Sequence, residues 1–153
     1  MKVKKKILIA GVGNLLFTDE GIGVHIIKEL SRKDLPEYVE LAEIGTATFE
    51  LSRFMEGKDK VIIIDAIISN ELPGTIYKLT PDELKKEKTK FLTSLHQYGI
   101  LDALESSAQM GNKPETIILG ITPKDYKTLS IELTPELKSS IQKIIKIILK
   151  EIK

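Results

Sequence analysis

The fold is decided by residues 7–30, which read ILIAGVGNLLFTDEGIGVHIIKEL. Ile7 to Ala10 form a short apolar run that ends at a glycine, a pattern typical of a buried parallel strand. After Gly23 the apolar side chains recur at helical spacing and predict an amphipathic helix. They are Val24, Ile26, Ile27 and Leu30. The segment therefore predicts a strand, a glycine-rich loop and a helix, and it places Asp19 and Glu20 in that loop.

The loop departs from the known phosphate-binding patterns. Gly11 and Gly13 fit the first two glycines of a dinucleotide-binding fingerprint, but Leu16 stands where the third glycine would fall. No Gly-Lys-Ser/Thr follows, and Asp19 and Glu20 would repel a pyrophosphate. The two acids instead predict a cationic partner such as a metal, an amine or an arginine. The alternative is that they only stabilise the dipole of the following helix.

A second carboxylate site follows another buried strand. The apolar run 61–64 ends in Asp65, and burying an unpaired carboxylate is unfavourable. Because the carboxyl ends of parallel strands line one crevice, Asp65 is expected to face the same cleft as the first loop. The alternative is an aspartate that caps a turn through its own backbone.

His96 is the third candidate and one of only two histidines. Ser94 and Gln97 have the spacing of a capping box, so His96 is expected in the first turn of a helix. The positive end of the helix dipole disfavours protonation there and leaves a neutral imidazole able to bind metal. The alternative is an ordinary exposed histidine, which is also the interpretation of His25 in the first helix.

Glu20, Asp65 and His96 together supply two carboxylates and one imidazole. This set suits a divalent ion of the nickel or zinc kind with coordination positions left open. The three residues are far apart in sequence, so only the predicted sheet topology brings them together.

The motifs also carry a resemblance to a family. The string GVGNLLFTDEGIGVHIIKEL (residues 11–30) resembles the N-terminal signature of the nickel-iron hydrogenase maturation endopeptidases. Shorter pieces follow in that family's order. They are Gly45-Thr46, Asp65-Ala66, Pro73-Gly74-Thr75, Ser94-Leu95-His96, Gly120-Ile121-Thr122-Pro123 and, more weakly, 133–137.

The resemblance implies a function and a substrate. At the positions of Glu20, Asp65 and His96, the family has its metal-contacting residues. Its substrate is the nickel-loaded precursor of the hydrogenase large subunit, from which a C-terminal extension is removed. The nickel is expected to be brought by the substrate rather than held permanently by the protease.

The chemistry predicted from the residues is direct attack by water. The chain has no cysteine, no Gly-x-Ser-x-Gly elbow and no His-Glu-x-x-His motif, so a nucleophilic mechanism or a resident catalytic zinc is hard to assemble. Asp19 or Asp65 could act as general base, and the metal or the backbone amides near Gly11 and Gly13 could stabilise the oxyanion. The predicted catalytic residues are Asp19, Glu20, Asp65 and His96.

Two other functions stay open. A nickel-binding or escort protein on the same fold would use the same three ligands without cleaving anything. A hydrolase acting on peptidyl-tRNA is a more distant alternative, because Asp19 and Glu20 would oppose the approach of a polyanion.

Alternating strands and helices predict a single domain over residues 1–153. The expected fold is a three-layer α/β/α sandwich on a mostly parallel sheet of about five strands. The expected strands are 3–10, 39–44, 61–64, 75–79 and 116–121, and the expected helices are 23–31, 48–55, a short one from 81, 95–109 and 135–152. The turn at Pro73-Gly74 is too short for a crossover, so the fourth strand is expected to be antiparallel to the third.

Composition narrows the remaining possibilities. The net charge of +1 argues against a nucleic-acid partner, and the lysines of the last helix are interpreted as a solvated face. The apolar runs fall well short of the roughly 20 residues of a membrane span, and no signal peptide is apparent. A cytoplasmic protein without disulfides is therefore expected, and the family resemblance suggests a monomer without a membrane partner.

Overall fold

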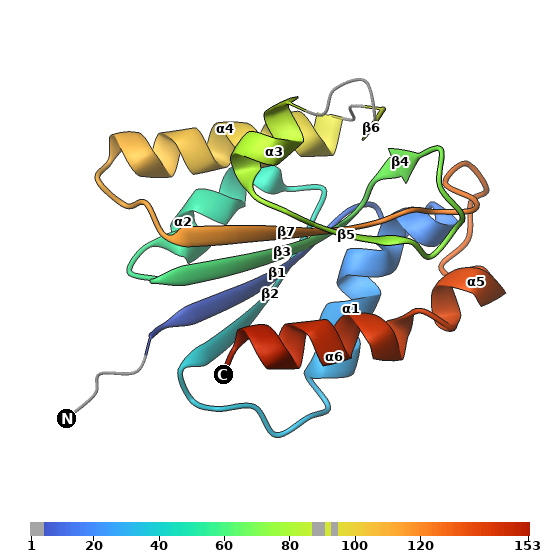
Figure 1. Cartoon of the computed structure of the whole chain (residues 1–153), viewed down its shortest axis with the longest axis horizontal. Helices are drawn as coiled ribbons and strands as arrows, with labels where there is room; N and C mark the ends of the chain where they lie inside the picture. The colour runs from blue at the N-terminus through green and yellow to red at the C-terminus, as the bar shows by residue number, and fades with distance from the viewer. Residues whose placement is uncertain (1–4, 87–90, 93–94) are drawn as a thin grey trace.

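The computed structural model describes residues 5–86, 91–92 and 95–153. Strands and helices alternate along the chain (Figure 1). The strands are β1 Ile7–Val12, β2 Val39–Gly45, β3 Lys60–Ala66, β4 Ile68–Ser69, β5 Ile76–Leu79, β6 Phe91–Leu92 and β7 Glu115–Ile121. The α-helices are α1 Ile22–Leu30, α2 Leu51–Met55, α3 Pro81–Lys86, α4 Leu95–Gln109, α5 Pro135–Lys138 and α6 Ile141–Glu151. Two short 3-10 helices are η1 Thr18–Gly21 and η2 Thr48–Glu50.

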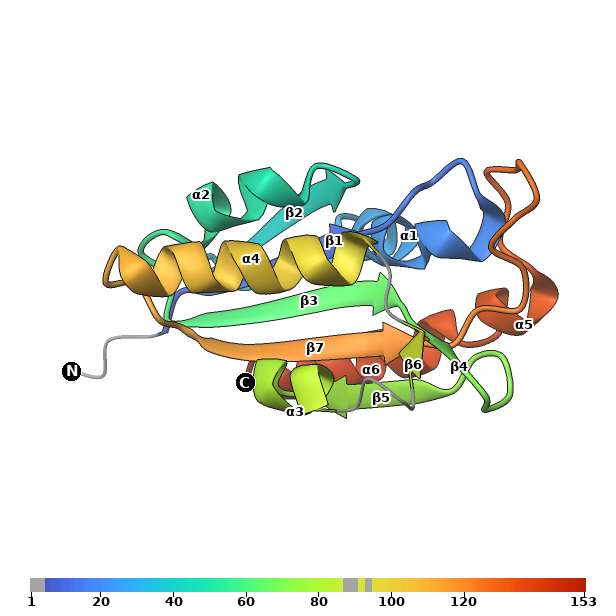
Figure 2. The same ribbon diagram turned by 90° about the horizontal axis from the view of Figure 1, so that it is seen from above.

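The main sheet has the order β2-β1-β3-β7-β5 (Figure 2). The first four strands are parallel and β5 is antiparallel, which confirms the mostly parallel five-stranded sheet. The predicted antiparallel direction of the fourth strand is correct, but its neighbour is β7 and not β3. Both edges of β3 are already occupied, by β1 and β7, so β5 cannot pair with β3 and instead pairs with the free edge of β7. The small β4-β6 sheet was not predicted.

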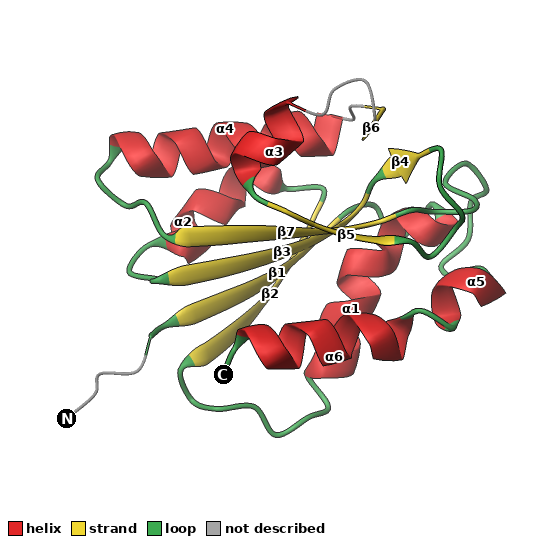
Figure 3. Cartoon of the chain, viewed as in Figure 1, coloured by secondary structure: helices red, strands yellow, loops and turns green. Residues whose placement is uncertain are grey.

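Helices cover both faces of the sheet and give the predicted three layers (Figure 3). Successive residues of β3 point to opposite faces, as they must in a strand. Ile62 and Ile64 pack with α1 and α6, whereas Val61 and Ile63 pack with α2 and α4. A strand buried on both faces explains why residues 61–64 are all apolar.

Two glycines bring α1 unusually close to the sheet. A Cβ on Gly23 would overlap the carbonyl oxygens of Val12 and Ile64, and a Cβ on Gly11 would overlap the carbonyl of Gly23. The contact is therefore backbone on backbone. It fixes where α1 begins, and with it the position of the preceding turn η1.

The predicted final helix is interrupted at Ser139 and Ser140, which separate α5 from α6. Both serine hydroxyls donate to the Glu136 carbonyl, at 2.8 and 3.0 Å. The Ser140 amide, which would bond that carbonyl in a continuous helix, donates instead to Leu137. Local side-chain bonds of this kind compete with the helical ladder. The first strand was predicted over 3–10; residues 3 and 4 lie outside the described residues, Lys5 and Lys6 are exposed and precede β1, and β1 continues beyond the predicted end to Val12.

Among the described residues, no helix combines the length and apolar composition needed to cross a membrane.

Candidate functional site

The predicted site residues lie at the carboxyl edge of the parallel strands. Glu20 is on η1, which follows β1; Asp65 is near the end of β3; and His96 is the second residue of α4. In Figure 2 the arrowheads of β3 and β7, the loop before α1 and the first turn of α4 meet at this edge. The position of His96 in the first turn of a helix is confirmed, whereas Ser94 of the predicted capping box lies outside the described residues.

Glu20 and His96 form a pair. Glu20 Oε1 lies 3.3 Å from His96 Nδ1, and the two side chains are 26% and 19% exposed. A carboxylate at Nδ1 favours the tautomer with its proton there, which leaves the lone pair on Nε2 for a metal. The pair therefore has the arrangement in which a carboxylate orients a metal-binding imidazole.

Asp65 is buried beside this pair, with 1% of its surface exposed. Its Oδ2 has no hydrogen-bond partner in the described part of the chain. Burial raises the pKa of the Asp65 carboxyl well above its ordinary value, and the charge of Glu20 raises it too, while a hydrogen bond from the Ala66 amide acts the opposite way. A buried polar atom without a partner is unusual in a native protein and points to a ligand or a catalytic role.

Gly13 allows Glu20 and Asp65 to approach each other. A Cβ on Gly13 would overlap the Glu20 carbonyl and would lie 3.4 Å from Asp65 Oδ1. Its φ of 122° also disfavours any other residue. The Gly13 amide donates to the Gly45 carbonyl at 2.9 Å, so this amide is already used within the fold, whereas an oxyanion site made by other amides near Gly11 and Gly13 stays a prediction.

The three residues do not form a preformed three-ligand site. In residues 5–86, 91–92 and 95–153, no group of three histidine or acidic side chains is placed to hold one metal ion. The structure thus brings together Glu20 and His96 directly and Asp65 electrostatically. A metal here would need further ligands or a side-chain adjustment.

Asp19 points away from this pair and is fully buried. Its carboxylate accepts hydrogen bonds from the amides of Lys124 (2.9 Å), Asp125 (3.1 Å) and Thr134 (2.8 Å), and from the Thr134 hydroxyl (2.8 Å to Oδ2). We call residues 122–134 the strap. Asp19 thus fastens the strap to η1, and Thr18 Oγ1 adds a bond to the Thr128 carbonyl.

The sequence reasoning did not identify Thr134 as a functional residue. Its one signal was the weak family match over residues 133–137, next to a proline that begins a helix.

Gly99 was also missed. A Cβ there would overlap the side chain of Thr48, so the glycine allows α4 to pack closely on η2. His96 lies one turn earlier on the same helix, and its position depends on this contact.

The other histidine is structural. His25 Nε2 lies 3.1 Å from the Ile131 carbonyl oxygen. Burial lowers the pKa of His25, and the hydrogen bond to Ile131 partly opposes this shift. The prediction of an ordinary exposed helix histidine is correct in that His25 is on α1, but its side chain is partly buried and contacts the strap.

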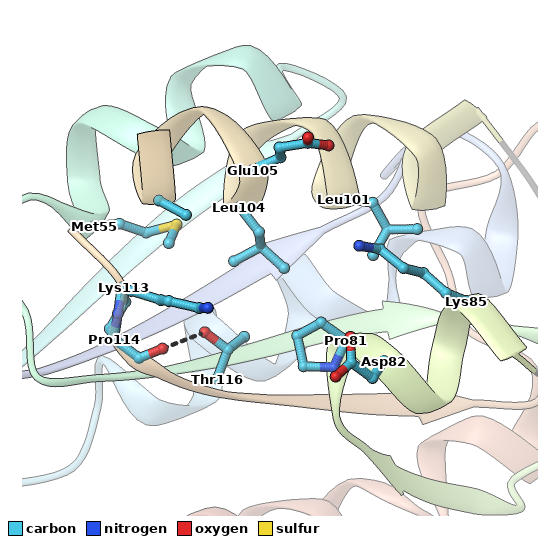
Figure 4. Close-up of a pocket in the computed structure, with 11 residues that line it drawn as sticks. Met55, Pro81, Asp82, Lys85, Leu101, Leu104, Glu105, Lys113, Pro114 and Thr116 are labelled. Atoms are coloured by element: carbon cyan, nitrogen blue, oxygen red, sulfur yellow. Dashed lines mark hydrogen bonds between the residues drawn. The ribbon is translucent and has the colours of Figure 1, made fainter. Parts of the chain in front are cut away.

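A cavity of about 390 Å³ lies near the opposite edge of the sheet (Figure 4). Leu101 and Leu104 of α4 line it, together with Met55, Lys113 and Thr116. It contains none of the predicted site residues and lies at the amino end of β7. We therefore assign the candidate site to the carboxyl edge.

Comparison with known proteins identifies the family. A family model described as hydrogenase maturation protease matches residues 24–151. The Hydrogenase 2 maturation protease of Escherichia coli is 39% identical over 140 residues, which cover 90% of this chain and 84% of that relative. The structure of the E. coli hydrogenase maturating endopeptidase HybD superimposes with a TM-score of 0.86 at 37% identity, covering 96% of this chain and 91% of that one. The NiFe hydrogenase maturation protease HybD of Thermococcus kodakarensis gives a TM-score of 0.82 at 29% identity, covering 97% and 99%. The chain therefore belongs to the hydrogenase maturation protease family, and it is a peptidase.

Proposed function

We propose that this protein removes the C-terminal extension of a nickel-loaded hydrogenase large-subunit precursor. Family membership supports the reaction class. The observation that carries the proposal to these residues is the buried Asp65 carboxyl, with an unpartnered Oδ2, beside the Glu20–His96 pair. This combination offers one imidazole nitrogen and two carboxylates at one edge of the sheet.

The nickel is part of the substrate in this proposal. Because no three of the described side chains are already placed around one point, we propose that the ion arrives with ligands from the precursor and leaves only its open side to the protease. His96, Glu20 and Asp65 would contact that side, and Glu20 would turn from His96 Nδ1 toward the ion to do so. The contact would hold the extension in register for cleavage.

Asp65 is the better of the two predicted bases. Both Asp19 oxygens already accept hydrogen bonds from the strap, so Asp19 has little capacity left to bind and activate water. Asp65 has a buried oxygen without a partner, which is free to accept a proton from water. We therefore propose Asp65 as general base and Asp19 as the residue that positions η1 and Glu20.

The decisive experiment uses large-subunit precursors from the same organism, in nickel-loaded and nickel-free form. Each is incubated with the protein and with His96→Ala, and intact masses are measured. We expect loss of a defined C-terminal peptide only from the loaded precursor and only with the unaltered protein. Intact precursors, together with tight nickel binding by the protein alone in calorimetry, would instead support the escort alternative.

Several expectations stay predictions. They are the single domain over 1–153, the monomeric state, the cytoplasmic location, and the lack of nucleic-acid and membrane partners. Size-exclusion chromatography with light scattering tests the monomer directly.

A further inference from the structure

Exposed apolar side chains are distributed unevenly over the described surface. Seven large hydrophobic side chains are strongly exposed. Six of them follow the carboxyl ends of strands or begin α4, and we call these the apolar rim. They are Leu16, Phe49, Leu72, Tyr98, Leu129 and Ile131. The seventh, Met110, follows the last turn of α4 at the opposite edge of the sheet.

The rim residues come from separate connections. Leu16 lies between β1 and η1, Phe49 is on η2, and Leu72 is in the turn between β4 and β5. Tyr98 is in the first turn of α4, two residues after His96. In Figure 2 the loop before α1, the turn between β4 and β5 and the start of α4 lie toward the arrowhead ends of the parallel strands, and η2 packs on α4 through Thr48 and Gly99. The rim therefore shares an edge with Glu20, Asp65 and His96.

The strap holds its part of the rim in place. The Ser130 amide donates to the Leu16 carbonyl at 2.8 Å, and the Thr18 amide donates to the Ser130 carbonyl at 2.9 Å. Leu129 and Ile131 flank Ser130, so they lie beside Leu16 on a paired backbone that Asp19 anchors. Exposed apolar side chains on a fixed backbone lose little entropy on binding. Gathered at one edge, they mark an interaction surface.

Resting on the function proposed above, we propose that the apolar rim docks the folded body of the hydrogenase large-subunit precursor. The rim is spread over five connections, whereas an extended peptide would follow a single line across them. At about 100 Å² per exposed side chain the rim offers about 600 Å², close to the roughly 800 Å² per partner of a standard interface. The rim shares the edge of the sheet that carries Glu20 and His96, so a body docked there can present its own C-terminus to them.

The test measures cleavage of the nickel-loaded precursor by rim variants. The double variant Leu129→Ser, Ile131→Ser removes the apolar side chains that the strap contributes to the rim. Phe49→Ser removes the apolar side chain that η2 contributes. We expect KM to rise about tenfold for the double variant with little change in kcat. Met110→Ser is the matched control, since Met110 is at least as exposed but lies at the other edge, and its KM should equal that of the unaltered protein. Circular dichroism of each variant checks the fold.

Binding measurements separate this inference from the proposed function. The unaltered protein could bind the precursor without cleaving it, while the rim variants bind about tenfold more weakly. In that case the proposed function is wrong and the docking role of the rim is supported. If the unaltered protein cleaves and the rim variants keep its KM, the rim inference is wrong. It is also overturned if the isolated extension peptide competes as well as the whole precursor, or if sedimentation shows a dimer that the rim variants dissociate.

Discussion

Replacing Asp19 should destabilise the protein strongly, although Asp19 lies outside the Glu20–His96 pair. In Asp19→Ala, three backbone amides and the Thr134 hydroxyl lose their acceptor. Each buried donor left without a partner costs about 1–3 kcal/mol, and water reaches some of them, so we expect a loss of about 3–5 kcal/mol. The free energy of unfolding of a typical domain is only about 5–15 kcal/mol.

Asp19→Asn should fall between the unaltered protein and the alanine variant. Every backbone group around the carboxylate is a donor, and the new amide can satisfy them with one oxygen only. We expect a loss of about 1–3 kcal/mol for Asn. Asp125→Ala is the matched control in the strap, because its carboxylate accepts hydrogen bonds from exposed groups within the strap itself, the amides of Lys127 and Thr128 and the Thr128 side chain.

Urea unfolding followed by circular dichroism measures these differences. The free energy of unfolding should increase in the order Asp19→Ala, Asp19→Asn, unaltered protein. The m-value should stay constant, because the surface area exposed on unfolding is similar in all three. A loss below about 1 kcal/mol for Asp19→Ala would refute the reasoning, because it would mean that the strap and η1 hold together without this carboxylate. The same variants should lose cleavage in step with the loosening of η1, which carries Glu20.

Three further predictions concern other parts of the molecule. Gly13→Ala should abolish cleavage, because its Cβ would displace the Glu20 carbonyl; Gly57→Ala, also at positive φ but with open space around it, should cost only about 1 kcal/mol and keep activity in the precursor assay. Asp65→Asn should be inactive yet more stable at pH 7, since burial disfavours the charged form of the Asp65 carboxyl in the folded state. The pKa of Asp65 is raised in the folded state, so this advantage should grow as pH rises above the ordinary pKa of 3.8, and unfolding at pH 3 and pH 7 checks it. Glu151→Gln should lose about 1 kcal/mol at pH 7 and less at pH 3, because Lys78 and Lys60 lower the pKa of Glu151, and their stabilisation disappears as the carboxylate is protonated in acid.

The sequence predicted the parts of the site that depend on local pattern. An apolar run that ends in a charge placed Asp65 at the end of β3, and helical spacing placed His96 at the start of α4. The rule that carboxyl ends of parallel strands share one edge then brought these residues near Glu20.

Other features depended on contacts that a local pattern does not contain. Asp19 and Glu20 are adjacent acids, and in a 3-10 helix successive side chains point about 120° apart. The strap, more than 100 residues further along the chain, determines which of the two acids accepts structural hydrogen bonds. β5 pairs with β7 because β1 and β7 already occupy both edges of β3. The last helix is interrupted at Ser139 because the serine hydroxyls bond the carbonyl that the helix would otherwise use.

The bonds between Asp19 and the strap also set when the protein can become active during its own synthesis. Asp19 is made early, but its partners Lys124 and Thr134 are 105 and 115 residues further along the chain. Until the ribosome has released the strap, η1 lacks its anchor and Glu20 has no fixed position opposite His96. The candidate site thus gains its anchor late in synthesis, and we expect a chain that ends before the strap to be unable to act on a precursor.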